Sequence, residues 1–253
     1  MSFRFYLITL GIIVVLGGML YGLDAIPWFR VKDIAVRGSN LVTVSEVRRA
    51  LISDADRASG ILAFLGNDHM LLWLTGGERD VWRAEVKSAS VTVYPFRQSV
   101  EVEVMERMLK GIFCTEGGAC YAFDEEGIVF ARAPAAKGQL MLTMSSKGGS
   151  ASGGRAEEEL QKGTQLFSSA EVARFSEIRS TLTDRGAVIT DIRLRAAELN
   201  EWEVVFADGK TLYFDRGFIP DDFGAMMDAL IAREDFEKMN YVDFRVPNKI
   251  YFR

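Results

Sequence analysis

The sequence contains few histidines and cysteines, the residues on which many metal sites and nucleophilic active sites depend. Its 253 residues include one histidine and two cysteines. A structural zinc site needs four ligands of these or similar kinds, and a Ser-His-Asp triad needs a histidine beside its nucleophile. These counts exclude many classes of enzyme, and we expect no metal, no cofactor and no catalytic residues.

An excess of basic residues is also missing. The chain has 30 Lys and Arg against 35 Asp and Glu, which gives a formal net charge of −5. Nucleic-acid binding needs a basic surface that neutralises phosphates, so we expect no such partner. The 49% of hydrophobic and 26% of charged residues exclude bulk disorder, and the length suits one large domain or two small ones.

One long uncharged run, FYLITLGIIVVLGGMLYGL, occupies residues 5–23. It has about the length that a helix needs to cross a hydrocarbon layer of roughly 30 Å. A cleaved signal peptide is the alternative, but no A-x-A cleavage pattern follows before Pro27. The run therefore predicts a transmembrane helix behind a short cytoplasmic tail, residues 1–4.

The orientation of this predicted helix is less clear from charge alone. Arg4 precedes the run, whereas Arg30, Lys32 and Arg37 follow it, so the positive-inside rule is ambiguous. Residues 1–4 are too few to fold, and we place them inside and the bulk of the chain outside. The predicted location is the cytoplasmic (inner) membrane, crossed once.

Residues 28–108 are predicted to form a small domain of strands and helices. Thr43 and Glu46 have the spacing of a capping box, so a helix should begin there. Residues 71–74 favour a second short helix. Residues 91–104 alternate apolar and polar positions around Tyr-Pro-Phe, which is typical of a hairpin with one buried face. The expected order is β-α-α-β-β.

Residues 109–253 are predicted to be rich in strands. The low-complexity stretch KGGSASGG indicates a flexible loop over 147–165. Helices are expected after Ser168, which has a second capping-box spacing, and after Asp222. We predict an antiparallel sheet with flanking helices, so the fold class is α+β.

With these elements in order, the chain resembles the FtsQ/DivIB family of bacterial cell-division proteins. The segment FRVKDIAVRGSNLVTVSEVRRAL is similar to the opening of that family's POTRA domain. The signature of the closing hairpin is matched by Pro95, Val102, Val104, Glu106 and Arg107. AFDEEGIVFARAP, WEVVFADGKTLYF and YVDFR then resemble pieces of the second domain in the family's order.

The resemblance implies a POTRA domain at 28–108 and a β-rich FtsQ/DivIB-like domain at 109–253. It also implies a non-enzymatic, single-pass membrane scaffold of the divisome at the division septum. Family members bind FtsB/DivIC-like and FtsL-like membrane proteins and connect them to septal peptidoglycan synthesis. Their partner adds a strand to the C-terminal strand. The tail 1–4 is shorter than in many members, which puts contacts made by longer tails in doubt.

The final strand supports this expectation by its own chemistry. A strand at a sheet edge presents unpaired backbone groups to an added strand. Alternate residues point to opposite faces, so Ile250 and Phe252 would share one face, and Tyr251 and Arg253 the other. The alternative is that these residues only complete the sheet. The predicted partner-binding residues are Tyr241, Arg245, Lys249, Ile250, Tyr251, Phe252 and Arg253.

Cys114 and Cys120 flank a glycine-bearing turn. A three-residue turn over 116–118 would set their Cα atoms about 5 Å apart, within reach of a disulfide. We predict a structural disulfide. Free thiols are one alternative, and a metal site, which would need two further ligands with His69 far along the chain, is the other.

Two other functions stay open at this point. A POTRA-containing envelope chaperone or transport component would also offer strand edges to passing polypeptides. A membrane-anchored enzyme acting on cell-wall glycans would need two carboxylates that converge on the glycosidic bond. The acidic runs at 124–126 and 157–159 fall in a turn and a helix start, which favours solvated faces over catalytic pairs.

Overall fold

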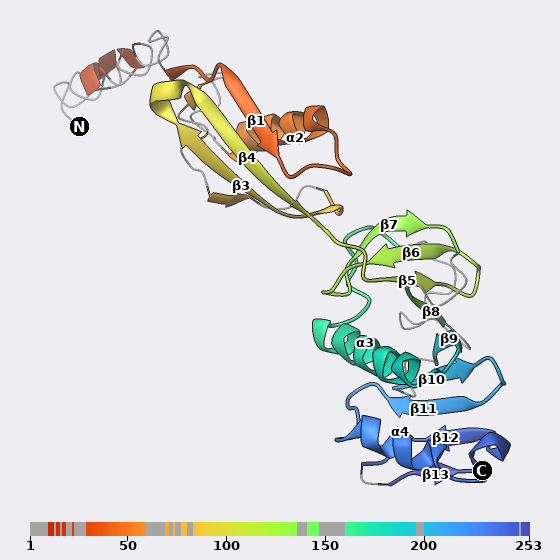
Figure 1. Cartoon of the computed structure of the whole chain (residues 1–253). Coiled ribbons are helices and arrows are strands. Elements are labelled where there is room, and N and C mark those ends of the chain that lie inside the picture. Colours follow the sequence, from red (N-terminus) through yellow and green to blue (C-terminus); the bar gives the residue numbers. More distant parts are fainter. Residues whose placement is uncertain are drawn as a thin grey trace. The chain divides into compact units, whose positions relative to one another are not determined.

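Figure 1 shows a computed structural model of the chain. The residues described are 10–12, 14, 15, 17, 18, 22, 29–58, 69, 70, 73, 77–79, 83–135, 141–146, 160–195, 200–247 and 249–253. The chain divides into two compact units, Met1–Glu106 and Arg107–Arg253. The boundary expected between residues 108 and 109 lies close to this division.

The prediction of a transmembrane helix over 5–23 is wrong. Among the described residues, no helix has both the length and the apolar character that crossing a membrane requires. Such a crossing takes about 20 consecutive residues. The predicted placement in the inner membrane, crossed once, with the N-terminus inside and the bulk outside at the division septum, is contradicted by the same finding.

The first unit is a four-stranded sheet with a helix on one face. Its strands follow the order β1-β4-β3-β2, with β1 parallel to β4 and the other neighbours antiparallel. The predicted sheet lacked β2. Of the predicted second helix at 71–74, only Trp73 is described, and it lies in a turn. The elements are β1 (Asp33–Arg37), α2 (Val44–Ala58), β2 (Gly77–Arg79), β3 (Val86–Tyr94) and β4 (Ser99–Glu106).

Local sequence explains where these elements begin and end. Glu46 accepts bonds from the backbone N–H and the hydroxyl of Thr43, at 3.1 and 2.7 Å, which fixes the start of α2. The alternating valines of β3 and β4 then pack under this helix and form the core of the unit. At the hairpin tip, Pro95 starts a short 3₁₀ turn and Gln98 takes a left-handed conformation.

The second unit is built on one nine-stranded sheet with the order β13-β12-β11-β10-β9-β8-β5-β6-β7. Its strands are β5 (Gly111–Cys114), β6 (Cys120–Phe123), β7 (Val129–Ala133), β8 (Leu142–Ser146), β9 (Ile189–Leu194), β10 (Glu201–Phe206), β11 (Thr211–Asp215), β12 (Tyr241–Asp243) and β13 (Tyr251–Phe252). Its helices are α3 (Ser169–Asp184) and α4 (Phe223–Ile231).

The expected antiparallel sheet is wrong, because this sheet is mixed. β8 and β9 are parallel and are joined through α3, and β11 and β12 are parallel and are joined through α4. Parallel neighbours need a long crossover, which a helix supplies. The fold class is corrected accordingly: most of the elements are strands, arranged in two sheets, with few helices and no described transmembrane helix.

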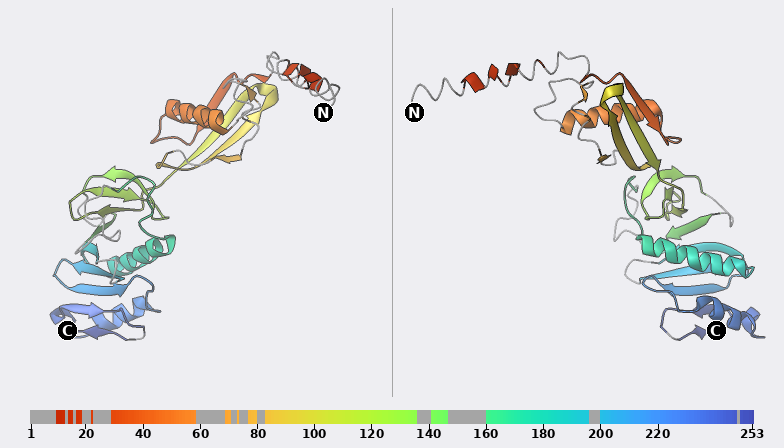
Figure 2. Two further views of the ribbon diagram at one scale, coloured as in Figure 1. Left: turned by 180° about the vertical axis from the view of Figure 1, so that it is seen from behind. Right: turned by 60° about the vertical axis from the view of Figure 1, so that its left-hand side comes forward.

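Both helices pack on one face of this sheet (Figure 2), where they cover an aromatic core. Phe175 of α3 meets Trp202 edge-on, and the Trp202 ring stacks on Phe214 with 4.8 Å between centroids. The indole N–H of Trp202 donates to the carbonyl of Asp215 at 3.2 Å, so this buried ring has its polar group satisfied. On the opposite face, β10, β11 and β12 carry polar and charged side chains, among them Glu203, Tyr213 and Asp243.

The predicted flexible loop 147–165 is described only in part. Residues 147–159 lie outside the described residues. The rest contacts β7, because the N–H of Gly163 donates to the carbonyl of Val129, and the N–H of Val129 donates to the carbonyl of Thr164. These bonds cover the start of β7, at the opposite end of the sheet from β13.

Candidate functional site

The last strand, β13, forms one end of the nine-stranded sheet (Figure 1). It is antiparallel to β12, with Phe252 opposite Val242 and Tyr251 opposite Asp243. Among the described residues, no strand pairs with its other side. The position predicted for strand addition is therefore a sheet edge.

The hydrogen bonds show which backbone groups this edge offers. Arg253 and Tyr241 exchange N–H···O bonds of 3.3 and 3.4 Å, which makes them a hydrogen-bonded pair. In an antiparallel ladder such pairs alternate with pairs whose backbone groups point away from each other. The N–H and C=O of Phe252, and by the same alternation those of Ile250, are therefore directed outward from the sheet.

The side chains of the edge differ between its two faces. Ile250 packs against the aromatic core and is partly buried. Phe252, on the same face, is 41% exposed and lies under the guanidinium of Arg233, 4.8 Å from the ring centroid. Tyr251, on the other face, is 49% exposed. One aromatic side chain on each face of an open edge can bury further surface when a strand is added.

Arg233 is held in place by Asp235. Its Nε and Nη2 donate to the two carboxylate oxygens at 2.9 and 3.0 Å. These hydrogen bonds keep the pKa of Asp235 below its ordinary value and raise that of Arg233. The pair lies in the turn after α4, so the helix positions a cation over the edge aromatic.

The polar face of the sheet behind the edge is tied together by Arg245. Its guanidinium donates to both carboxylate oxygens of Asp243, at 2.9 and 2.6 Å, and to Glu201 of β10. The hydrogen bonds from Arg245 lower the pKa of Asp243. The Arg245 guanidinium also lies 5.3 Å from the centre of the Tyr213 ring. This network holds β12, the strand on which β13 rests, to β10 and β11.

The seven predicted residues thus have different positions. Tyr251, Phe252 and Arg253 line the edge, with Ile250 on its core side and Lys249 exposed in the preceding turn. Tyr241 belongs to β12, and Arg245 lies on the face of the sheet, so both support the edge from behind. Sequence reasoning missed Arg233 and Asp235, and nothing in their sequence spacing indicates that they reach β13.

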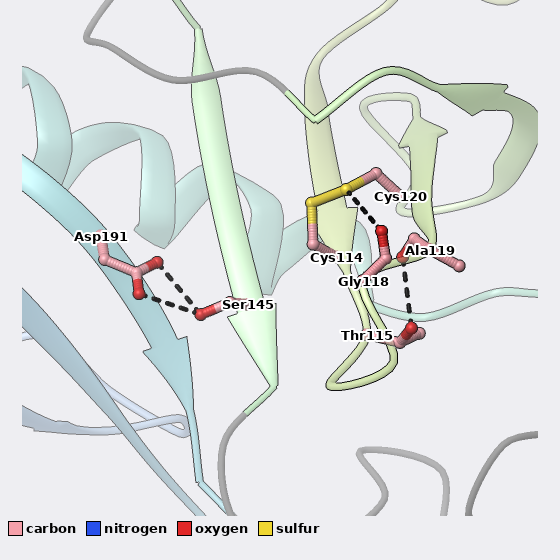
Figure 3. Close-up of a disulfide and its surroundings, with 7 residues drawn as sticks. All are labelled: Cys114, Thr115, Gly118, Ala119, Cys120, Ser145 and Asp191. Atoms are coloured by element: carbon pink, nitrogen blue, oxygen red, sulfur yellow. Dashed lines mark hydrogen bonds between the residues drawn. A yellow bond between two sulfur atoms is a disulfide. The ribbon is translucent and has the colours of Figure 1, made fainter.

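The two cysteines lie at the far side of the same sheet and are joined by a disulfide (Figure 3). They occupy opposite positions at the ends of β5 and β6, with Cα atoms 4.0 Å apart. Beside Cys114 in the register stands Ser145 of β8, whose hydroxyl donates to both oxygens of Asp191 at 3.1 Å. The disulfide closes the β5–β6 hairpin and is distant in the strand order from β13.

Within the part of the chain that the structure describes, no group of three or more His, Cys, Asp or Glu side chains could hold a metal ion. His69 is buried and stacks on Phe29 in the first unit, 5.9 Å between ring centroids.

No protein-family model matches the chain, and no curated protein matches it either.

Proposed function

We propose that the protein is a non-enzymatic scaffold that captures a partner by adding a strand to β13. The resemblance to the FtsQ/DivIB family names the partner class: an FtsB/DivIC-like protein, together with its FtsL-like companion, recruited toward septal peptidoglycan synthesis. The observation that carries the proposal is the open edge of β13, with the backbone groups of Ile250 and Phe252 directed outward.

The edge is short, and its energetics follow from that. Ile250 and Phe252 each offer one N–H and one C=O to an added strand, and a net contribution near 1 kcal/mol per bond gives about 4 kcal/mol. A micromolar complex needs about 8 kcal/mol. The aromatic rings of Tyr251 and Phe252 must supply much of the difference, and both are still about half exposed.

The backbone geometry allows a sharp test by substitution. Phe252→Pro removes the outward N–H that an added strand needs, whereas the bonds to β12 are made by Tyr251 and Arg253. Phe252→Leu keeps that N–H and an apolar side chain, and is the matched control. We expect Phe252→Pro to lose co-purification with the FtsB/DivIC-like protein of the same genome, and Phe252→Leu to retain most of it.

A second variant removes the whole edge. Truncation after Pro247 deletes β13 and should abolish co-purification, while thermal unfolding of the first unit stays unchanged because its core is separate. Retained co-purification in both the truncated chain and Phe252→Pro would place the partner elsewhere and overturn the proposal.

A further inference from the structure

The first unit has an open sheet edge of its own, at β1. Among the described residues, no strand pairs with the side of β1 that faces away from β4. The N–H groups of Lys32 and Asp33 both donate to the carbonyl of Gln98, at 2.8 and 3.4 Å. The parallel register sets Asp33 beside Ser99, so the bond from Asp33 is the one that belongs to the ladder with β4. The carbonyl of Ile34 accepts a bond from the Nη2 of Arg48. Because a strand's backbone groups alternate in direction, Ile34 and Val36 point theirs outward.

The sequence of β1, Asp-Ile-Ala-Val-Arg, is self-complementary for antiparallel pairing. When two copies meet about a two-fold axis at Ala35, Asp33 of each lies opposite Arg37 of the other. Ile34 of each lies opposite Val36 of the other, and the small Ala35 meets its own copy at the axis. The outward backbone groups of Ile34 and Val36 then face each other in register, as a hydrogen-bonded ladder requires.

The two faces of β1 suit this pairing as well. Ala35 stands beside Glu101 in the register, so Asp33 and Arg37 lie on the solvent side of the sheet. Opposite charges directly across a strand pair are favourable there. Ile34 and Val36 are partly buried against the valine core on the α2 side, where apolar side chains of a second copy would extend that core.

One side chain of α2 opposes the pairing. The Nη2 of Arg48 donates to the carbonyl of Ile34 at 2.9 Å, so it occupies one of the outward acceptors. In a symmetric pair the two Arg48 guanidinium groups would also lie on the same side of the sheet near the axis, where like charges repel. Natural sheets use such basic side chains to protect their edges.

We propose that β1 is a self-association edge, through which two copies join their four-stranded sheets, and that Arg48 keeps this edge closed in the monomer. The proposal concerns the first unit alone and is independent of β13. Its partner is a second copy of this chain, because the charge order of β1 complements itself.

Sedimentation equilibrium of the full chain tests the role of Arg48. Arg48→Ala removes one opposing hydrogen bond from each copy, and two such bonds correspond to a roughly 30-fold tighter dimer. Arg49→Ala is the matched control, because it deletes the same charge from the next residue, whose Nε donates within the helix to the carbonyl of Ser45 at 3.3 Å. We expect this control to sediment like the unchanged protein.

Disulfide cross-linking tests the register. In the Arg48→Ala background, Ala35→Cys should cross-link to the same residue of the second copy. Residue 35 forms a non-hydrogen-bonded pair with its own copy, and the Cα atoms of such a pair lie about 4.5 Å apart, within reach of a disulfide. Asp33→Cys should not link to itself but should link to an Arg37→Cys chain when the two are mixed. The native cysteines are the only two in the sequence and are bonded to each other, so they do not interfere.

An Arg48→Ala chain that associates no more strongly than the Arg49→Ala chain would overturn the proposal. So would equal self-linking of the Ala35→Cys and Asp33→Cys chains, because that pattern indicates association without the predicted register. Far-ultraviolet circular dichroism of each variant confirms that the comparison is between folded chains.

Discussion

Glu106, at the end of β4, is predicted to fix the loop that connects β1 to α2. One oxygen of its carboxylate accepts bonds from three successive backbone N–H groups, those of Asn40, Leu41 and Val42, at 2.8, 2.7 and 3.0 Å. Without this carboxylate the three N–H groups lose their acceptor at once. We expect Glu106→Ala to release the loop from β4 and to destabilise the first unit.

The magnitude follows from the number of bonds and their exposure. A hydrogen bond to a charged group contributes about 1.5–3 kcal/mol when it is well shielded, and this loop is largely exposed, so about 1 kcal/mol per bond is a suitable value. Three bonds then give about 3 kcal/mol for Glu106→Ala. Glu106→Gln keeps an acceptor oxygen without the charge and should lose roughly half of that.

Hydrogen exchange followed by mass spectrometry measures this directly in the full chain. The peptide that covers residues 38–44 should exchange faster in Glu106→Ala, and to a smaller extent in Glu106→Gln. Glu103→Ala is the control, because Glu103 is exposed on the other face of β4 and should change stability by less than about 0.5 kcal/mol. If the loop peptide exchanges as slowly in Glu106→Ala as in the unchanged chain, the anchoring role is refuted.

Two further predictions concern the second unit. Replacing Cys114 and Cys120 by serine opens a loop whose cysteines are six residues apart in sequence, and chain entropy predicts a loss of about 2 kcal/mol in the free energy of unfolding. Urea unfolding measures this loss, and the unchanged chain in its reduced form is the control. Hydrogen bonds from Arg245 lower the pKa of Asp243 in the folded state. The ionised carboxylate therefore stabilises the fold fully above the pKa of an unfolded aspartate, about 3.9. This stabilisation is lost as the pH falls through the lower pKa of the folded state. Urea unfolding should therefore show a smaller loss of stability on acidification below about pH 4 in Asp243→Asn than in the unchanged chain, and equal losses would contradict this assignment.

Short-range patterns in the sequence predicted much of the local structure. The capping pair Thr43 and Glu46 marks the start of α2, and Ser168 with Glu171 forms the complete capping box at the start of α3. The alternating valines of β3 and β4 form the predicted hairpin with one buried face. These features depend on residues a few positions apart, so their physics is contained in a short window of sequence.

Patterns that depend on the environment of a segment were less informative. The uncharged run 5–23 predicted a membrane-spanning helix from its composition, and no described helix meets that requirement. The alternating strands of the second unit gave no sign of which neighbours are parallel. The direction of a neighbour depends on the crossover through α3 or α4, which an alternation pattern does not contain.

Glu106 and Arg107, two neighbouring residues of the signature that resembles the family's, make contacts with different parts of the fold. Glu106 reaches back to the loop before α2. Arg107 points the other way along the chain and pairs with Asp124, whose other oxygen accepts from the backbone N–H groups of Glu126 and Ile128. Two adjacent residues thus fix two turns that are far from each other in sequence.

By itself the sequence determined where helices such as α2 and α3 begin and that β3 and β4 form a hairpin, and it supplied the chemistry of the last strand: two aromatics beside a basic residue. Only the tertiary structure decided which strands end a sheet and which backbone groups face outward. It also placed Arg233 over Phe252 and Arg48 on Ile34. The physical reason is that an edge is defined by the absence of a neighbour, and neighbours in a sheet are chosen by contacts between residues far apart in the chain.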